Sequence, residues 1–391
     1  MIRKEQADAL FYKEFGDIKR KHYFSHGRIE IIGNHTDHNN GLCLVGGSTL
    51  GITASVAKND LGTVRIASTG YRPYEFNINS LEADPAEKGT SLALTKGVLF
   101  ALKKLGYKIG GFFAALDSDI PAGSGVSSSA CYEALIGEII NDLYNGGAIP
   151  AHDLAFASQY AEVLYFGKPC GMLDQVGCCY GGVNYLDFKD AQNPIIEPLE
   201  FNLPLIPVLV LTKSSHEGLD SLYASIPNDM KQVASNVFGK SVLREVDPSD
   251  FYKLIAQPTA GVSEIAKLRA THYMDENKRV LEARRAILSH DIATFLRCVN
   301  TSGESSKALL QNTMVPGRYK NSPQEAVDVA KRFIGEGACR IMGGGFAGSI
   351  LCFVLPSNKD NFLRAMRGIY GEKSVLEESF TPGGAKMIDA E

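Results

Sequence analysis

The sequence predicts an α+β protein of two domains that meet at a cleft. Its 391 residues exceed what one hydrophobic core usually supports, so we expect two domains. Four prolines recur between residues 191 and 207, and a boundary there gives domains of residues 1–200 and 201–391. Polar motifs that could belong to one site occur in both halves. The site is therefore expected in the cleft between the domains.

The first half alternates between helical and strand patterns. Apolar residues at helical spacing predict helices over residues 1–20, 91–105, 128–143 and 153–166. Runs of β-branched and other apolar residues predict strands over residues 26–33, 42–56, 64–67 and 111–116. Residues 58–62 resemble a hairpin connection between the second and third of these strands. Glu133, on the third helix, is expected to be a solvated surface charge.

The second half contains fewer clear signals. A strand is predicted over residues 208–211 and a long basic helical region over residues 265–288. Residues 342–348 form a glycine-rich turn that leads into the apolar run of residues 349–354. We expect this run to be a buried strand.

The sequence PAGSGVSSSA, residues 121–130, has the composition of a phosphate-binding loop. It follows a predicted strand and precedes a helix, whose first N–H groups and dipole favour an anion. Glycine permits positive φ and a close approach of the backbone. The alternative is a flexible turn whose serine caps the helix. The candidate nucleotide contacts are Gly123, Ser124, Gly125, Val126, Ser127, Ser128 and Ser129.

Two other polar stretches invite a functional interpretation. Residues 34–41, NHTDHNNG, concentrate polar side chains in a turn, although Asn and Asp also build turns by bonding their own backbone. Residues 167–175 form a loop, rich in Gly and Pro, that presents Asp174 from an apolar setting. An acid there is either a helix cap or a working carboxylate. Glu162, before this loop, has the same two interpretations.

Composition narrows the class of function. A net charge of −4 argues against a surface for nucleic acid or anionic membranes, and the longest apolar runs are too short to span a bilayer. The N-terminal residues show no secretion signal. Eight scattered cysteines without zinc spacing predict reduced thiols and a cytoplasmic location. The expected partner is a small molecule, without nucleic acid or membrane, and a monomer is compatible with the sequence.

Together these motifs resemble those of the GHMP kinases, and within them the galactokinase family, over nearly the whole chain. The family signature GRxNxIGEHTDYxxG is matched by GRIEIIGNHTDHNNG at residues 27–41. PxGxGLSSSA is matched at residues 121–130, PCGxxDQ at residues 169–175, and GGGFGG at residues 343–348 with Ala347 for a glycine. Weaker matches are RxxHxxxENxR at residues 269–279 and a tyrosine at Tyr223. Several motifs in the same order make the resemblance specific.

The resemblance implies the two-domain GHMP kinase fold, ATP and Mg²⁺, and phosphorylation of the anomeric hydroxyl of galactose. It implies that Asp174 accepts the proton of that hydroxyl and that Arg28 steadies the transferring phosphoryl group. Neither is expected to be a core residue. Ser129 and Glu162 match the magnesium ligands, and the loop of residues 123–129 matches the triphosphate site. The implied sugar-binding positions are Asn34, His35, Thr36, Asp37 and Tyr223.

Two departures from the family pattern bear on the choice of sugar. Asn34 replaces a glutamate understood to bind the C6 hydroxyl of the sugar, and His38 replaces a tyrosine. An amide still bonds a hydroxyl, and it also tolerates a C6 carboxylate. Galactose is therefore the expected substrate, with galacturonate or a related galacto sugar as the alternative. A non-catalytic sensor of galactose or ATP stays open, whereas a GHMP decarboxylase or isoprenoid kinase would not explain residues 35–38 or Tyr223.

Overall fold

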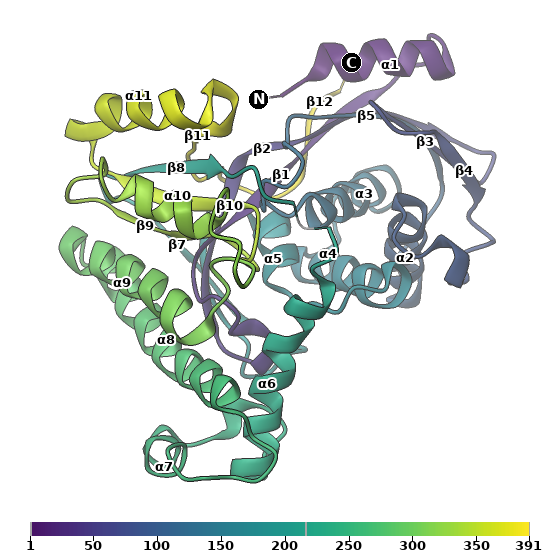
Figure 1. Cartoon of the computed structure of the whole chain (residues 1–391). Helices are drawn as coiled ribbons and strands as arrows, with labels where there is room; N and C mark the ends of the chain where they lie inside the picture. The colour runs from purple at the N-terminus through teal and green to yellow at the C-terminus, as the bar shows by residue number, and fades with distance from the viewer. Residues whose placement is uncertain (1, 216, 391) are drawn as a thin grey trace.

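The computed structural model describes residues 2–215 and 217–390, which form two β-sheets with helices packed against them (Figure 1). Within these residues the larger sheet has eight strands, in the order β12-β1-β2-β5-β3-β4, with β6 paired to β2 and β7 to β6. Its strands are β1 (Lys21–Ile32), β2 (Leu42–Asn59), β3 (Thr63–Ser68), β4 (Tyr74–Asn77), β5 (Gly111–Ser118), β6 (Val183–Asp187), β7 (Ile195–Leu199) and β12 (Lys386–Ala390). The smaller sheet, in the order β11-β8-β10-β9, consists of β8 (Ile206–Leu211), β9 (Ala338–Ile341), β10 (Ser349–Val354) and β11 (Val375–Glu377).

Helices cover both sheets, which confirms the predicted α+β class. The larger sheet carries α1 (Lys4–Phe15), α2 (Ser91–Lys104), α3 (Ser128–Asn145), α4 (Ala151–Tyr160) and α5 (Leu173–Tyr180). A π-helical turn, η3 (Ala161–Phe166), continues α4. The second half contributes α6 (Asp220–Phe238), α7 (Pro248–Leu254), α8 (Glu264–Leu288), α9 (Ile292–Ser305), α10 (Pro323–Ala330) and α11 (Lys359–Tyr370). None of the helices in the described part of the chain is long and apolar enough to cross a membrane.

Apolar side chains of β5 point to both faces of the larger sheet, which explains why helices cover both faces. Phe112, Ala114 and Leu116 belong to the core shared with α2–α5, whereas Ala115 packs with Phe11 of α1. Side chains of a strand point alternately to opposite faces, so an uninterrupted apolar run needs partners on both. Figure 1 shows α1 apart from the group α2–α5.

Most predicted elements of the first half are confirmed, but one pairing is wrong. Residues 58–62 do connect β2 to β3, yet these two strands are not neighbours. Strand β5 lies between them, antiparallel to β2 and parallel to β3. The chain therefore crosses over through α2 before β5 completes the sheet. Strands β6 and β7 were not predicted, and β7 lies inside the proline-rich stretch of residues 191–207.

The two halves share a core where the site is built. Ile29 and Ile31 of β1 belong to one buried apolar cluster with Val280 of α8, Phe295 of α9 and Leu351 of β10. In Figure 1, α8 and α9 run side by side beneath the smaller sheet, next to β1 and β2. The C-terminal strand β12 returns to pair with β1. The domains of residues 1–200 and 201–391 stay a prediction, and they are joined through these contacts.

Candidate active site

The loop of residues 121–130 has the backbone that its glycines predict. Gly123 and Gly125 both have φ of 73°, in the region that glycine favours. Ser127 occupies the N-cap position of α3 with φ of 58°, but its side chain makes no cap hydrogen bond. Instead its hydroxyl donates to Asp174 Oδ2 at 2.5 Å. The alternative of a simple serine cap is therefore wrong for Ser127, whose backbone strain serves a contact with a carboxylate.

Arg28 and Asp174 lie together although 146 positions separate them. Arg28 Nε donates to Asp174 Oδ1 at 2.7 Å, and Arg28 Nη1 donates to the carbonyl of Gly125 at 2.6 Å. The guanidinium of β1 thus bridges the carboxylate and the phosphate-type loop. The prediction that Asp174 lies in a loop is wrong, because it lies in the first turn of α5. Its side chain is 28% exposed, so it can contact a substrate.

The charge of Asp174 is set by its neighbours. Burial alone would raise its pKa, but the charges of Arg28 and Lys168 and the Ser127 hydroxyl outweigh burial and hold that pKa below its usual value. Arg28 itself is only 5% exposed. The expectation that neither residue belongs to the core is therefore wrong for Arg28, because its side chain is packed inside the protein.

A hydroxyl and a carboxylate meet at the other side of the loop. Ser129 Oγ donates to Glu162 Oε1 at 3.0 Å, and Glu162 is buried. Lys168 Nζ and Gln175 Nε2 also donate to this carboxylate, at 3.2 and 3.1 Å. Mg²⁺ keeps most of its water and takes one or two protein oxygens together with substrate phosphates. The donor set of Ser129 and Glu162 fits that requirement.

Glu133 is part of this cluster and is not the predicted surface charge. It is fully buried, and Gln175 Nε2 lies 3.4 Å from its Oε2. Burial, and then the nearby Glu162, raise the pKa of Glu133 well above its ordinary value. Sequence reasoning missed its place, although Ser129 and Glu133 are four residues apart and so share one face of α3. Lys168 and Gln175 were also missed, within or beside the PCGxxDQ motif.

The turn of residues 33–42 connects β1 to β2 and carries the predicted sugar-binding side chains. His35 and Asp37 are half-buried, with a short 3₁₀ turn, η1 (Asp37–Asn39), between strand ends. Thr36 is fully buried, and its hydroxyl contacts the carbonyl oxygens of Gly33 and Leu42 at 2.9 and 2.7 Å. Thr36 therefore shapes the turn instead of presenting its hydroxyl.

Asp37 lies close to the loop before α5 and feels the charge of Asp174. Its Oδ2 lies over Gly171, where an added Cβ would be only 2.0 Å away. This contact explains why the loop before α5 has glycine at that position. Burial, and then the charges of Asp174 and Glu30, raise the pKa of Asp37 to about 7. The carboxyl is thus poised between its charged and neutral forms near neutral pH.

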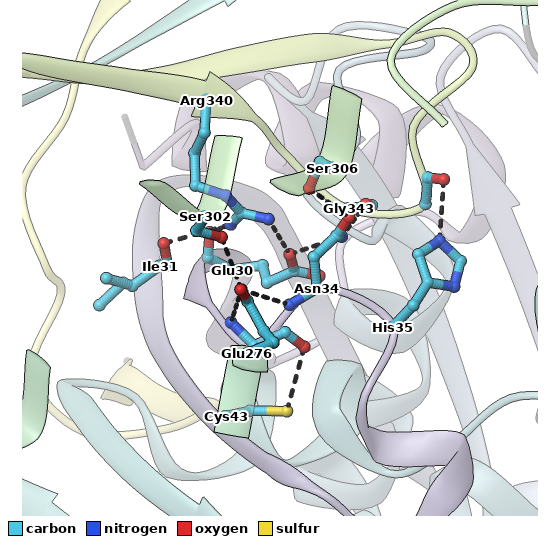
Figure 2. A network of polar contacts seen from close by, with 12 residues as sticks. Glu30, Ile31, Asn34, His35, Cys43, Glu276, Ser302, Ser306, Arg340 and Gly343 are labelled. Atoms are coloured by element: carbon cyan, nitrogen blue, oxygen red, sulfur yellow. Dashed lines mark hydrogen bonds and ion pairs between the residues drawn. The ribbon is translucent and has the colours of Figure 1, made fainter. Parts of the chain in front are cut away.

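Asn34 is fully buried inside a polar network (Figure 2). Its amide nitrogen donates to Glu30 Oε1 at 2.9 Å and to the carbonyl of Gly343 at 2.6 Å. Its amide oxygen accepts from Asn312 at 2.9 Å and Ser306 at 3.3 Å. All parts of the amide are therefore engaged within the protein. Direct sugar contact by Asn34 stays a prediction, and this conformation favours an indirect role.

Glu30 carries the carboxylate of this network. Arg340 of β9, which is fully buried, donates from Nη2 to Glu30 Oε1 at 2.9 Å. The family signature has Asn and Glu at the positions of Glu30 and Asn34, so this chain has the two side-chain types in exchanged order. The exchange keeps one carboxylate and one amide in contact, and it moves the charge from the turn into the strand.

A chain of hydrogen bonds runs through the two histidines of the turn. His35 Nε2 lies 2.9 Å from the carbonyl of Gly344, which can only accept, so Nε2 carries the proton. His35 Nδ1 is then the acceptor for His38 Nε2 at 3.3 Å, and His38 Nδ1 accepts from the Asn39 amide at 3.0 Å. Burial lowers the pKa of both histidines, which keeps the chain neutral. These hydrogen bonds link the turn of residues 33–42 to the glycine-rich turn of residues 343–348.

Tyr223 reaches the site from α6. Its hydroxyl donates to the carbonyl of Gly345 at 2.9 Å, and its ring packs edge-on against Phe346. A Cβ added to Gly343 would lie 3.5 Å from Arg28 Nη2. The glycine-rich turn therefore lies between Arg28 and Tyr223. The structure thus brings Arg28, Asp174 and Ser127 into direct contact, and Ser129 contacts Glu162. His35 and Tyr223 both contact the glycine-rich turn, whereas Asp37 lies over Gly171.

Known proteins resemble this chain in sequence and in fold. Family models for the GHMP kinases N terminal domain and the galactokinase galactose-binding signature match residues 93–182 and 9–58. A galactokinase of Streptococcus suis (strain 05ZYH33) is 30% identical over 403 residues, covering 99% of both chains. One of Glaesserella parasuis serovar 5 (strain SH0165) is 29% identical and covers 96% of both chains. The structure of Lactococcus lactis galactokinase complexed with galactose is 25% identical, with a TM-score of 0.86 over 98% of this chain and 99% of that chain.

Proposed function

This chain belongs to the galactokinase family of the GHMP kinases, and we infer from that membership that it phosphorylates galactose with ATP and Mg²⁺. The γ-phosphoryl group is transferred to the anomeric hydroxyl, giving galactose 1-phosphate and ADP. The observation that carries the inference is the contact between Arg28 and Asp174, because it sets an ionised carboxylate beside the loop that we assign to the triphosphate.

Asp174 is the residue that we assign to the proton of the anomeric hydroxyl. A general base must be ionised and correctly oriented before the hydroxyl can attack. Arg28 and Lys168 favour the ionised form, and the Arg28 and Ser127 contacts fix the two carboxylate oxygens separately. As the hydroxyl oxygen bonds to phosphorus, its proton passes to the carboxylate, and the bond to the leaving ADP oxygen breaks.

The rest of the machinery neutralises charge and fixes position, which matter more than covalent chemistry in phosphoryl transfer. The Arg28 guanidinium is held between Asp174 and the Gly125 carbonyl, so it cannot swing away from the loop. The first-turn N–H groups of α3 lack intrahelical acceptors and favour an anion. Mg²⁺ supplies charge neutralisation on the phosphates when it is bound. Ser129 and Glu162 are the residues that would hold it.

We assign sugar recognition to His35, Asp37 and Tyr223, with Thr36 and Asn34 supporting the turn from inside. The occupied amide of Asn34 favours galactose over galacturonate. Its nitrogen donates to Glu30 and to the Gly343 carbonyl, so Asn34 has no free N–H left to neutralise or bind a C6 carboxylate. A sensor is also disfavoured, because Arg28, Ser129, Glu162 and Asp174 are all present.

The test is ATP-dependent turnover on galactose, galacturonate, arabinose and N-acetylgalactosamine, measured side by side as ADP release. We expect galactose to be the best substrate. Asp174→Asn, which keeps the shape of the side chain, should lower kcat by about 10²- to 10⁴-fold. It should still unfold cooperatively in urea, at a lower midpoint because the buried Arg28 loses its charged partner. Good turnover of another sugar without turnover of galactose would overturn the substrate assignment. Binding of galactose and ATP without ADP release would indicate a sensor.

We also assign the reaction to the cytoplasm. The support is chemical: all eight cysteines are free thiols, and seven of them are buried, so the fold uses them as packing groups and not as cross-links. Fractionation of cells that express the tagged chain tests this assignment.

A further inference from the structure

One face of α8 holds the backbone of the turn that carries the sugar-binding residues. The side chains are His272, Tyr273, Glu276 and Asn277, whose spacing puts them on one side of a helix. They belong to the RxxHxxxENxR motif, to which the proposed reaction gives no role. We call these four residues the α8 clamp, and we call residues 33–42 the sugar turn.

The clamp contacts backbone atoms along the whole sugar turn. Glu276 Oε1 accepts the N–H groups of Gly33 and Asn34 at 3.0 and 3.2 Å. His272 Nε2 donates to the Asn34 carbonyl at 3.0 Å. Further along, the Tyr273 hydroxyl donates to the Asn39 carbonyl at 2.9 Å, and Asn277 Oδ1 accepts the Leu42 N–H at 2.7 Å. Both ends and the middle of the sugar turn are therefore tied to one helix.

The clamp is itself held rigidly. Glu276 is fully buried, and its carboxylate also receives Ser302 Oγ at 2.5 Å and Arg279 Nε at 2.7 Å, as Figure 2 shows in part. Ser305 Oγ lies 2.9 Å from His272 Nδ1, so this nitrogen accepts while Nε2 donates to the turn. Hydrogen bonds to a charged group away from water are stronger than neutral exposed ones. The clamp thus imposes one backbone conformation on the sugar turn.

Other residues hold the loop of residues 121–130, which we assign to the triphosphate and call the phosphate loop. The N–H of Arg28 donates to the Val126 carbonyl at 2.9 Å, and Ser349 Oγ donates to the Ser124 carbonyl at 2.6 Å. These contacts come from β1 and β10. A change in the clamp therefore acts on the sugar turn and leaves the supports of the phosphate loop in place.

We propose that the α8 clamp sets the affinity for the sugar, by fixing the backbone of the sugar turn so that His35 and Asp37 stand in position before the sugar arrives. The inference deepens the proposed galactose kinase function and rests on it. Its members are positioning residues, because they touch the turn and not the reacting atoms. Preorganisation of this kind lowers the entropy cost of binding.

Two variants with one control test the proposal. Tyr273→Phe removes one hydroxyl from a buried ring, and Glu276→Gln removes the charge that receives the turn amides. Arg284→Gln is the control, because Arg284 lies on α8 but pairs with Glu197 away from the turn. We expect the KM for galactose to rise about 3- to 10-fold in Tyr273→Phe and about 10- to 100-fold in Glu276→Gln. The KM for ATP should stay within about twofold of the control.

Hydrogen exchange gives a readout that does not depend on turnover. In the free protein, amide exchange in residues 33–42 should be faster in both variants than in Arg284→Gln, with residues 121–130 unchanged. Equal sugar KM values in Tyr273→Phe and the control, or equal increases in the KM values for sugar and ATP, would overturn the proposal.

The two failures can be told apart. If the unmodified protein does not phosphorylate galactose, the proposed function fails, and exchange in residues 33–42 still decides whether the clamp holds the turn. If Glu276→Gln does not fold, Tyr273→Phe decides, because it leaves the buried ring in place and removes only its hydroxyl. Unchanged exchange in Tyr273→Phe would then contradict the clamp.

Discussion

Asp37 is the residue whose protonation should control the sugar affinity. Its side chain is half-buried, and burial, followed by the charges of Asp174 and Glu30, raises its pKa to about 7. Asp174 has its pKa held low instead, so it stays ionised over the same pH range. The two carboxyl groups therefore differ in protonation at neutral pH, although each lies within the electrostatic influence of the other site charges.

We expect kcat/KM for galactose to rise as the pH is raised through about 7, because only ionised Asp37 can accept hydrogen bonds from sugar hydroxyls at both oxygens. Asp37→Asn should lower kcat/KM and remove this limb of the profile. The measurement is the pH dependence of kcat/KM at saturating ATP for both proteins. The same limb in Asp37→Asn would show that another group is responsible.

The free energy of unfolding should fall over the pH range in which kcat/KM for galactose rises. The folded-state pKa of Asp37 is raised above its ordinary value of 3.8, so its contribution to stability is fully present below that value and is lost as the pH rises through about 7. The free protein therefore gives up stability over the range in which its sugar affinity increases. Urea unfolding at pH 5 and pH 8 measures this, and Asp37→Asn should reduce the difference.

At the scale of elements, the glycine-rich turn of residues 343–348 shows why its glycines are not equivalent. Gly345 has φ of 77°, and an added Cβ would lie 2.2 Å from the carbonyl oxygen of Asn312. At Gly344, φ is ordinary, and the Cβ would meet the Tyr223 ring at 2.8 Å. Backbone cannot easily give way, whereas a ring can rotate or shift.

Gly345→Ala should therefore lower the free energy of unfolding by about 2–4 kcal/mol, from backbone strain and overpacking together. Gly344→Ala should change it by less than about 1 kcal/mol but raise the KM for galactose, because it displaces Tyr223. Urea denaturation of both variants, followed by circular dichroism, makes the comparison. Equal losses of stability would mean that φ at Gly345 is not the cause.

The helices and strands differ in how well the sequence could predict them. Long periodic segments such as α3 and α8 were predicted nearly to their ends, because period 3.6 is a local signal. The place of β5 between β2 and β3 was not, since pairing depends on contacts far apart in sequence. Strand β7 was hidden by Pro198, which is tolerated because β7 lies at an edge, paired to β6 within the described residues. Helix α5 was read as loop because Pro169 and Gly171 precede it directly.

Some residues of the candidate site could be predicted from the sequence, and others could not. The sequence motifs led to Arg28 and Asp174 and to the glycine φ values of the phosphate loop, which depend on residue type and spacing. Glu133 was misjudged because its environment comes from Glu162 and Gln175, on other elements. Asn34 stays a predicted sugar contact, but the sequence could not show that Glu30, Asn312 and Gly343 occupy its amide.

At the scale of the whole molecule, the two halves should not be independent folding units. The core that contains Ile29, Ile31 and Leu44 of the larger sheet is completed by residues of α8, α9 and the smaller sheet. The buried pair of Glu30 and Arg340 also joins the halves. Separating the halves would expose this apolar surface and leave both charges unpaired, which costs several kcal/mol.

We therefore expect one cooperative unfolding transition for the full chain, and fragments of residues 1–200 and 201–391 that do not fold when expressed alone. Fragment 1–200 lacks β12, which pairs with β1, as well as the helices that cover the opposite side of residues 29–45. The chain has no tryptophan, so tyrosine fluorescence and far-UV circular dichroism are the two probes, and their urea curves should coincide. Two separate transitions, or a fragment 1–200 with a cooperative transition of its own, would instead mean that the boundary near residue 200 divides two autonomous domains and that the cleft between them is free to open.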